Sequence, residues 1–584
     1  MEDLIIRKPV VSVDTKCVER CPPKTHSKAK VMKDFNIKNI CKYGIVLKKS
    51  GIYKFTRDVV FKSKYEIPAI TISCSNITLD FGIYSLRQKR QNVINYGILI
   101  DRDVENITIT GTNKVSIEDF TLAGIRVLGR TQNIRIENLI ISNKESRQIL
   151  NEDLPVECKD IINYPLCLGI AIGEGDTGHL AMKNTDRINT VSGVVLTHVV
   201  CRKATIGCQM VFTEGIDIQN SNFIENTYYG LLCGYSWLIR GLPGKVAFPC
   251  ASNGKINNCR FDNNKGLNEN LSNPGNLYVF DFVSGIGLYG CQNFTVENSS
   301  CDDNSNNGYI LAADHDGSHN CVWKNCTFIR NRSENSTCDG LHFSGSVPRT
   351  ISSCQGDLLP LSPCINISVS YCFSSDNSGL SGNGFVMAYC NGFKMKNCVS
   401  IGNTSNGFRI IGSLPSGEIY GVALEDCTAE NNGGRENISS GIYIQGVGKN
   451  VVIKNCILNG NMGQNFSAGI IGNGKIENVD ITGCIVNGNG SGILMKNIEK
   501  LVLENNKSNF NTGDGIDVEK INGCVIKNNC VDFNKIGIKV DGSYLVAGNV
   551  AYGNKSNYSG VNNVVTVDFE NLPSSIGMKN ISVL

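Results

Sequence analysis

Apolar and polar residues alternate along the chain in short runs, and a glycine introduces most of these runs. The phrase glycine, apolar, any residue, apolar occurs at Gly97–Ile100, Gly124–Val127 and Gly169–Ile172 and returns along most of the chain. Alternation over four to six residues is typical of a β-strand with one buried face and not of a helix. Where the glycines lie closest they are about 22 to 23 residues apart, as between Gly492 and Gly515.

A second phrase lies between the glycine phrases. It is an alternating apolar run that ends in Asn or a substitute and is often followed by Cys, as in Val322–Cys326 and Ile453–Cys456. Asn and Gly tolerate left-handed backbone and therefore mark corners. Short strands at a fixed period of 20 to 30 residues indicate a solenoid. We predict an all-β, single-stranded parallel β-helix of about 14 coils with capped ends, in which Asn and Cys stack from coil to coil.

These phrases resemble right-handed parallel β-helix proteins of the pectate-lyase-like superfamily, in the repeat style of NosD-type proteins. Segments 51–60, 69–72 and 76–82 resemble the opening coils of such helices. The resemblance implies a right-handed helix over roughly residues 45–560 and does not imply one reaction, because this fold hosts many activities. The high content of Asn, Lys and Ile also resembles uncharacterised β-helix proteins of large cytoplasmic DNA viruses.

Charge and composition divide the chain into three regions. We expect a basic N-terminal arm or cap at 1–44, the right-handed parallel β-helix at 45–545 and a C-terminal cap or tail at 546–584. Residues 1–50 carry 12 Lys and Arg against 5 Asp and Glu, whereas the whole chain has a formal net charge of only +3. Nucleic acid is therefore an unlikely partner for the chain as a whole. The arm either caps the first coil or contacts an acidic partner.

The chain shows no feature that would place it in a membrane. No apolar run approaches the roughly 20 residues that cross a bilayer, and residues 1–10 lack the apolar stretch of a signal peptide. We expect no membrane span, and synthesis inside the cell with reduced thiols; the viral resemblance would add a virion as the destination. A homo-oligomer stays open, because β-helical fibres of the family are often trimers.

The 26 cysteines are expected to pack as small apolar side chains. Disulfides between neighbouring coils and soft-metal binding remain the alternatives. The expected cysteine ladder consists of Cys259, Cys326, Cys372, Cys398, Cys427, Cys456 and Cys484.

The densest cluster of titratable residues lies beneath clustered insertions. The insertions fall at about 142–167, 173–193, 235–254, 266–283 and 345–365, and loops often carry function, so we expect a groove over coils 169–345. Its outward column is taken as the second residue after each glycine, which gives Ile310 after Gly308 and His342 after Gly340. Spacings of about one coil lead us to expect that Asp314 stacks with Asp339, and His315 with His342. The expected catalytic residues are Asp314, His315, Asp316, Asp339 and His342.

These residue types suit two reactions on a polysaccharide. Paired carboxylates serve glycoside hydrolysis, whereas a His beside an Asp can abstract the proton next to a uronate carboxyl group. Residues 309–315 resemble a stretch of alginate epimerases, although the spacing differs and a proline is absent. The alternative is that the acids merely build corner turns. Residues 511–517 resemble the polygalacturonase signature with an extra glycine, but its downstream elements are missing, so we reject that identification.

Further residues are expected around the groove. Aromatic faces can stack on sugar rings, so we expect Tyr235 and Tyr289, with His319 and Arg409, to contact substrate. Asp302 and Asp303 could hold Ca²⁺ through carboxylate oxygens, and no other cofactor is expected. The sequence therefore predicts a protein that faces a polysaccharide or glycan surface, as a polysaccharide lyase, glycoside hydrolase or uronate epimerase. The alternative is a non-catalytic structural or glycan-binding rod, such as a virion or surface component.

Overall fold

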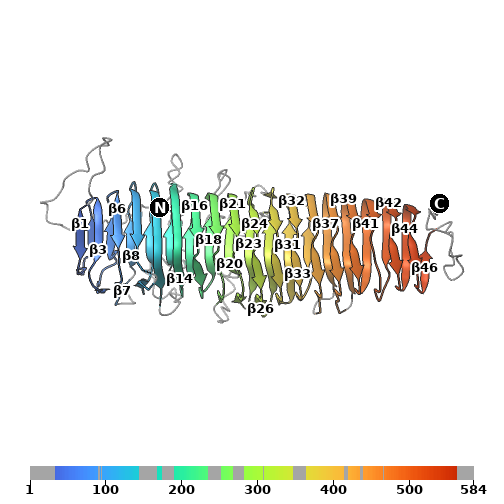
Figure 1. Ribbon diagram of the computed structural model, residues 1–584, viewed down its shortest axis with the longest axis horizontal. Coiled ribbons are helices and arrows are strands. Elements are labelled where there is room, and N and C mark those ends of the chain that lie inside the picture. Colours follow the sequence, from blue (N-terminus) through green and yellow to red (C-terminus); the bar gives the residue numbers. More distant parts are fainter. Residues whose placement is uncertain are drawn as a thin grey trace, which may run out of the picture.

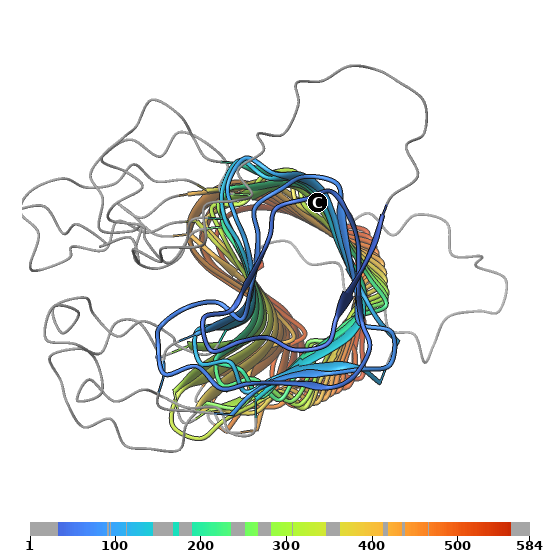
Figure 2. The ribbon, with the colours of Figure 1, turned by 90° about the vertical axis from the view of Figure 1, so that its left-hand side faces the viewer.

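The protein is a rod of stacked coils in a computed structural model (Figure 1). Every strand pairing in its described part is parallel and joins one coil to the next. Viewed along the rod, the coils superpose and their outline is indented on one side (Figure 2). The structure describes residues 33–561 except 90–92, 94, 113, 144–167, 174–189, 235–250, 267–281, 307, 346–362, 413–417, 435–437 and 465.

Three columns of strands build the wall of the rod. The column that contains the glycine phrases, here called the glycine sheet, consists of β2 (Ile45–Leu47), β5 (Ile70–Ile72), β8 (Tyr96–Ile100), β11 (Ala123–Val127), β13 (Leu168–Ile172), β15 (Ile206–Met210), β18 (Tyr229–Gly234), β20 (Phe282–Tyr289), β23 (Tyr309–Asp316), β27 (Thr337–Ser344), β31 (Ser381–Ala388), β34 (Phe408–Ile411), β37 (Ile438–Lys454), β39 (Phe466–Thr482), β41 (Ser491–Glu504), β42 (Ile516–Lys527), β44 (Ile536–Ala547) and β46 (Ser556–Ser559). From β37 to β44 these strands continue around a corner into the second sheet, which begins with β1 (Asp34–Ile37), β3 (Gly51–Phe55), β6 (Ile77–Asp80), β9 (Glu105–Thr110), β12 (Gln132–Ser142), β14 (Val191–Arg202), β16 (Thr213–Gln219), β19 (Ala251–Asn257), β21 (Cys291–Glu297), β24 (Val322–Lys324), β28 (Cys364–Ile365), β29 (Ser368–Ser370), β32 (Cys390–Lys396) and β35 (Ile419–Glu425). The third sheet and its corners contain β4 (Val59–Phe61), β7 (Leu86–Gln88), β10 (Ser116–Glu118), β17 (Asn222–Ile224), β22 (Ser305–Asn306), β25 (Thr327–Ile329), β26 (Arg332–Ser333), β30 (Phe373–Ser375), β33 (Val399–Ile401), β36 (Thr428–Glu430), β38 (Ile457–Asn459), β40 (Ile485–Asn487), β43 (Cys530–Asp532) and β45 (Val550–Tyr552).

The solenoid is longer than the glycine phrases indicate. The glycine sheet holds 18 strands in its described part, which is 14 phrases plus four further coils. One of the four, β15, has Cys208 where the phrase expects an aliphatic residue; β2 follows a further repeat glycine, Gly44; and β5 and β46 lack the glycine. Because β1 pairs with β3 and β44 with β46, the pairing extends past both ends of segment 45–545. Residues 1–32 and 562–584 are not described, so the two caps remain predictions.

The glycine of each phrase is required by the close approach of the next coil. A Cβ atom added to Gly407 would lie 2.7 Å from the carbonyl oxygen of Gly441 and 3.1 Å from Nδ2 of Asn432. Real Cβ atoms do not come that close to backbone, so any larger residue would push two coils apart. The glycines therefore mark a line along which consecutive coils and a buried amide meet.

That amide belongs to an asparagine ladder inside the rod. From Asn264 onward, each Nδ2 donates to the Oδ1 of the next member at 2.8–3.3 Å. Backbone N–H groups also donate to these oxygens, so the predicted stacking of Asn at corners is confirmed. The ladder consists of Asn226, Asn264, Asn304, Asn331, Asn377, Asn403, Asn432, Asn461, Asn489, Asn511, Asn534 and Asn554.

The cysteine ladder is also present, with one interruption. Ser299 lies between Cys259 and Cys326, and its Oγ accepts a hydrogen bond from the backbone N of Cys259. Each member donates to the carbonyl two residues earlier, whether it is a thiol, as Cys427 to Glu425 at 3.3 Å, or a hydroxyl, as Ser299 to Glu297 at 2.8 Å. All 20 described cysteines are free thiols.

The interior between the three sheets is a continuous apolar core, to which the inward residues of nearly every described coil contribute. Burial is the main reason why the pKa of the Cys326 thiol is raised well above its ordinary value, which keeps this member of the ladder protonated. No helix that could cross a membrane occurs in the described ranges.

Breaking the asparagine ladder should destabilise the rod. Asn432→Asp removes both amide donors and places a carboxylate oxygen against the carbonyl of Ser400 and Oδ1 of Asn461. We expect the free energy of unfolding to fall by about 2–4 kcal/mol, because Oδ1 keeps its donors from Asn403 while the second carboxylate oxygen is buried against acceptors only. The control is Asn450→Asp on the exterior, where Oδ1 only accepts from Asn478 and an aspartate can still accept. Equal denaturation midpoints for the two variants would contradict this role of the ladder.

Candidate functional site

The strand register places the acidic cluster differently from the sequence prediction. In β23 the glycine position is taken by Ala312 and not by Gly308, because Ile286 pairs with Ala313. The residue of this coil in the outward column is therefore Asp314, which takes the place expected for Ile310 on the same face of the strand, and both side chains are buried. The glycine position moves by four residues, so the face is kept and only the residue in the column changes, since side chains alternate between faces with a period of two.

This register corrects both predicted pairs. Asp314 lies beside His342 on the next coil, and Asp339 lies beside Leu311, so the expected stacking of Asp314 on Asp339 is wrong. His315 lies beside Phe343, so the expected stacking of His315 on His342 is wrong as well. The two pairs have spacings near one coil, but their members occupy different positions within it.

His315 faces the core. It is fully buried, its ring stacks on that of Phe343 at a centroid distance of 4.7 Å, and its Nε2 accepts a hydrogen bond from Trp323 Nε1 at 2.6 Å. Burial lowers the pKa of His315 to about 3, so the ring is neutral. A side chain enclosed in this way cannot reach a polysaccharide, and the structure removes His315 from the predicted catalytic set.

On the outward face, Asp314 is part of a chain of hydrogen bonds. Tyr289 donates its hydroxyl to Asp314 Oδ2 at 2.7 Å, and the hydroxyls of Tyr289 and Tyr229 are 3.2 Å apart. Both tyrosines are buried. Burial, followed by the charge of Asp314, raises the pKa of Tyr289 well above its ordinary value, so Tyr289 remains a proton donor to the carboxylate.

The neighbouring coil supplies a histidine held by an aspartate. His342 Nδ1 lies 2.8 Å from Asp339 Oδ2, and Asn383 donates to Asp339 Oδ1 at 2.8 Å. Asp339 is 2% exposed, whereas the His342 side chain is 20% exposed. The amide of Asn383 is itself held by Asn406, which donates to its Oδ1 at 3.0 Å. The carboxylate therefore fixes one ring nitrogen of His342 and leaves the other to act.

The charge balance around His342 favours its protonated form. Burial lowers its pKa, but the hydrogen bond and charge of Asp339, together with the charge of Asp314, outweigh burial and raise the pKa above its ordinary value. The positive charge of Arg409 acts in the opposite direction. A histidine that an aspartate holds in this way suits a group that exchanges protons with a substrate.

Arg409 lies two coils farther along the same outward column, since His342 pairs with Val386 and Val386 with Arg409. Its guanidinium lies over the ring of Tyr443, 6.0 Å from the ring centroid. Its buried Nε has no hydrogen-bond partner among the described residues. Arg409 is therefore a cation with a spare donor near the Asp339–His342 pair, and it remains a substrate-binding candidate.

The structure does not bring every predicted residue to this place. His319 follows a corner and bridges to Gln292 and Ile365 in the second sheet, away from the outward column. Asp316 pairs with Tyr289 and Ser344 through the backbone, but its side chain lies outside the described set. Tyr235 also lies outside the described residues.

The two predicted calcium ligands are occupied by protein donors. Asp302 accepts hydrogen bonds from Thr327 Oγ1 at 3.0 Å and from the backbone N of Ile329 at 2.8 Å, and Asp303 forms a two-pronged ion pair with Arg330. Burial is the main reason why the pKa of Asp302 is raised to about 6. Across the described ranges, no group of three or more His, Cys, Asp or Glu is arranged to hold a metal ion.

The predicted site residues did not include three functional partners: Tyr229, Asn383 and Tyr443. Tyr229 and Asn383 directly precede repeat glycines, and Tyr443 is the second residue after one. Their positions relative to the repeat glycines could have marked them as candidates. Only the strand register shows which residues of the next coil lie beside them.

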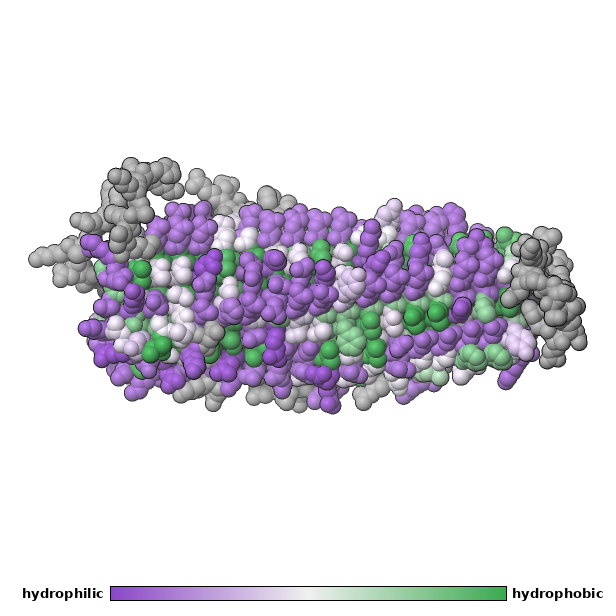
Figure 3. Space-filling model, in the orientation of Figure 1, coloured by the Kyte–Doolittle hydropathy of each residue, from purple (hydrophilic) through white to green (hydrophobic). Residues whose placement is uncertain are grey.

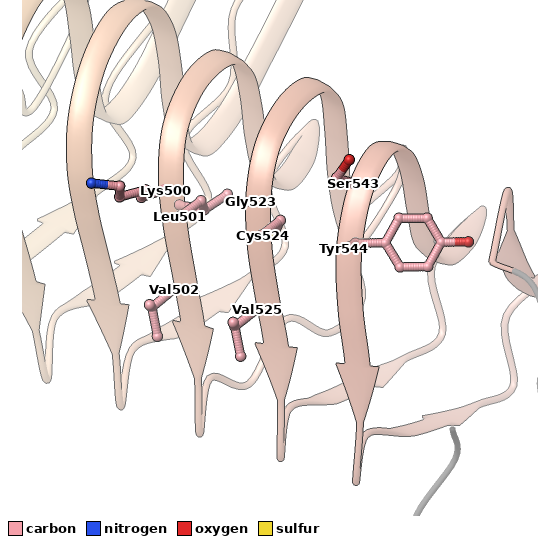
Figure 4. Close-up of a pocket in the computed structure, with 8 residues that line it drawn as sticks. All are labelled: Lys500, Leu501, Val502, Gly523, Cys524, Val525, Ser543 and Tyr544. Atoms are coloured by element: carbon pink, nitrogen blue, oxygen red, sulfur yellow. The ribbon is translucent and has the colours of Figure 1, made fainter.

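Another surface feature lies near the C-terminal end of the rod. It is a shallow groove of about 360 Å³ along β41, β42 and β44, with Val502, Val525 and Tyr544 in its wall (Figure 4). Its single charged side chain is Lys500, and none of the predicted site residues lines it. The groove therefore offers little for acid–base chemistry, and the His342 region remains the candidate site.

Because His315 is neutral and buried, acid should destabilise the protein through it. The folded-state pKa lies below the ordinary value, so the unfolded chain binds more protons between about pH 6.5 and 3, and stability is lost as pH falls through this window. Asp302 contributes to the pH dependence of stability with the opposite sign. Its pKa is raised, so the folded chain binds more protons between about pH 6 and 4, and this contribution to stability grows as pH falls. We expect His315→Gln, which keeps an acceptor for Trp323, to remove about 2 kcal/mol of the stability difference between pH 7 and 5. Chemical denaturation at both pH values measures this, and an unchanged difference would contradict the assignment.

Comparisons with known proteins agree with this architecture. Residues 417–571 match the family model of the right-handed β-helix region. A search of curated proteins finds no match. Among solved structures, the A-module of the Azotobacter vinelandii mannuronan C-5 epimerase AlgE6 is 12% identical with a TM-score of 0.41, covering 67% of this chain and 89% of that one.

Two other solved structures have different roles. The Streptococcus pneumoniae surface protein and adhesin PfbA is 13% identical with a TM-score of 0.37, covering 76% of this chain and 90% of that one. The catalytic unit of a GH87 alpha-1,3-glucanase from Streptomyces thermodiastaticus is 12% identical with a TM-score of 0.35, covering 73% and 60%. The parallel stacking of its coils gives the described chain the fold of a right-handed parallel β-helix, and residues 417–571 match the family model of that region.

Proposed function

We propose that the protein modifies an acidic polysaccharide by proton transfer at a uronate residue, as a lyase or an epimerase, on the outward face around His342. The observation that carries this proposal is the Asp339–His342 pair beside Asp314, with Arg409 on the same column. Asp339 holds Nδ1 of His342, which leaves Nε2 as the nitrogen that accepts or donates a proton.

The reaction needs a base and a cation. In its neutral form, His342 would take the proton from the carbon that carries the uronate carboxyl group, so that the C–H bond breaks and its electron pair moves toward the carboxylate. Arg409 would stabilise the charge that develops there. Inversion of the sugar is completed when solvent delivers a proton to the opposite face of that carbon and His342 releases its proton to solvent. In the lyase reaction, the proton on His342 passes to the neighbouring glycosidic oxygen as it departs, and a double bond remains in the ring.

Hydrolysis is the weaker interpretation because the carboxylates are already engaged. A glycosidase needs one carboxylic acid to protonate the leaving oxygen and a second carboxylate as base or nucleophile. Both oxygens of Asp339 are held, by His342 and Asn383, and Tyr289 donates to Asp314. Neither arrangement resembles a free pair of carboxyl groups that flank a bond.

A non-catalytic glycan-binding rod is the second candidate. It is favoured by the mixed and partly apolar outward column before Asp314, where Arg126 and Gln209 flank Ala171, and Ala171 and Leu232 are buried in a satellite cluster with Tyr289. These positions supply no acid, base or nucleophile for a reaction on a glycan. Turnover of any glycan by the wild-type protein separates the two candidates.

The decisive experiment compares pH profiles on a panel of uronate polysaccharides. In Asp339→Asn, the charge that raises the His342 pKa is gone, so we expect kcat/KM to fall about 100-fold and its rising limb to move to lower pH. The unsaturated product or the inverted sugar is followed by absorbance and NMR. Asp303→Asn is the matched control, since that carboxylate pairs with Arg330 on the surface and should leave turnover unchanged. Full activity and an unmoved limb in Asp339→Asn would exclude His342 as the proton carrier.

A further inference from the structure

Two phenylalanines occupy a left-handed corner that Gly402, Gly460 and Gly488 fill in other coils. The corner before the glycine strands has a left-handed backbone, and Gly460 and Gly488 take it with φ of 63° and 65°. Phe510 and Phe533 take the same corner in the next two coils, with φ of 57° and 56°. A bulky residue is strained in this region, and Phe510 is also 62% exposed. Neither the backbone nor the core requires an aromatic ring here.

The rings form a stack with one open face. Phe510 and Phe533 are parallel within 3° at a centroid distance of 5.1 Å, and Tyr552 meets Phe533 edge-on at 5.6 Å. Phe533 leans over the following coil, since a Cβ on Gly553 would lie 2.6 Å from its ring. On the other side of Phe510, a Cβ on Gly488 would meet no side chain within 4 Å. The outer face of Phe510 therefore looks onto open surface.

The open face has a polar rim. The Oδ1 of Asn487 accepts the backbone N–H of Asn509 at 3.0 Å, which fixes the amide beside the corner. The Nδ2 of Asn487 has no hydrogen-bond partner in the described part of the chain and can donate to a ligand. Asp532 accepts from Tyr552 and Cys530, so its carboxylate is already engaged. The surface combines an apolar centre with uncharged donors.

We infer that Phe510, Gly488 and Asn487 form a binding site for one neutral pyranose ring of a polysaccharide. One face of a pyranose carries C–H groups and packs on an aromatic face. Its hydroxyl groups point outward to the rim, where their oxygens accept hydrogen bonds from amide N–H groups. From the Phe510 ring, the surface is open along the rod across Gly488 for about two coil spacings, on the order of 10 Å. A sugar ring fits there at van der Waals distance from the phenylalanine ring. On the face drawn in Figure 3, a band of apolar positions interrupts the polar surface in the right-hand half.

The site is separate from the proposed catalytic residues. Six successive pairings lead from His342 to Asp517 in β42, the strand that follows Phe510 in the chain. At about 4.8 Å per coil this is roughly 30 Å along the rod. The stacking site therefore does not depend on the proposed reaction, although one long polysaccharide could reach both places.

Affinity electrophoresis of the full chain in gels that contain single polysaccharides tests the site. The panel contains neutral glucans, mannans and xylans together with alginate and pectin. We expect at least one neutral polymer to retard the wild type and Phe510→Asn to bind it about tenfold more weakly. The variant should melt no lower than the wild type, because Asn suits left-handed backbone. Asp339→Asn should keep full retardation, which separates this site from the catalytic proposal.

Tyr371→Asn is the matched control. Tyr371 is also left-handed, with φ of 54°, and 57% exposed, but no ring stacks on it in the described structure. Its loss should leave retardation unchanged. The inference is overturned if no neutral polymer retards the wild type, if Phe510→Asn binds as well as the wild type, or if both variants weaken binding equally. It is also overturned if Phe510→Asn abolishes self-association in sedimentation and alters no glycan binding, because the stack would then be a contact between copies.

Discussion

The close approach of consecutive coils at the glycine column is the constraint on which this structure depends. At Gly407 the neighbouring carbonyl and the amide of Asn432 already fill the space of a side chain. That contact lets the buried amides meet one another, and the ladder of amides in turn satisfies the backbone groups at each corner. The buried amide of each asparagine therefore needs a glycine beside it, and the recurrence of the two residues together fixes the register of the coils.

Register also decides which residues can do chemistry. Within β23 and β27 the outward positions are Asp314 and His342, whereas the inward positions hold His315 and Phe343. Asp314 and His315 are neighbours in one strand, but Asp314 belongs to a chain of hydrogen bonds on the outer face and His315 packs in the core. The protein gains an aspartate-held histidine on its surface and, one residue away, an uncharged histidine that serves only packing.

The sequence was sufficient for the fold and only partly sufficient for the site. Glycines that recur with a shortest spacing of about 22 to 23 residues, with Asn at the corners, predict stacked coils because few other folds repeat short strands so closely. The register around Asp314 could not be predicted, since Gly308 resembles a repeat glycine while Ala312 occupies the real position. Tyr229 and Asn383 could not be assigned either, because a hydrogen bond between coils depends on which insertions separate them.

The column that contains the cysteine ladder accepts several residue types at one position of the coil. Ser299, Cys427 and Asn529 all donate to the carbonyl two residues earlier, so a hydroxyl, a thiol and an amide meet the same need. Each coil carries its own copy of that bond, beside bonds to the next coil such as the one from the backbone N of Cys259 to Ser299 Oγ. A duplicated or deleted coil would keep the bond within every remaining coil, which makes rod length a property that gene duplication can change in whole steps.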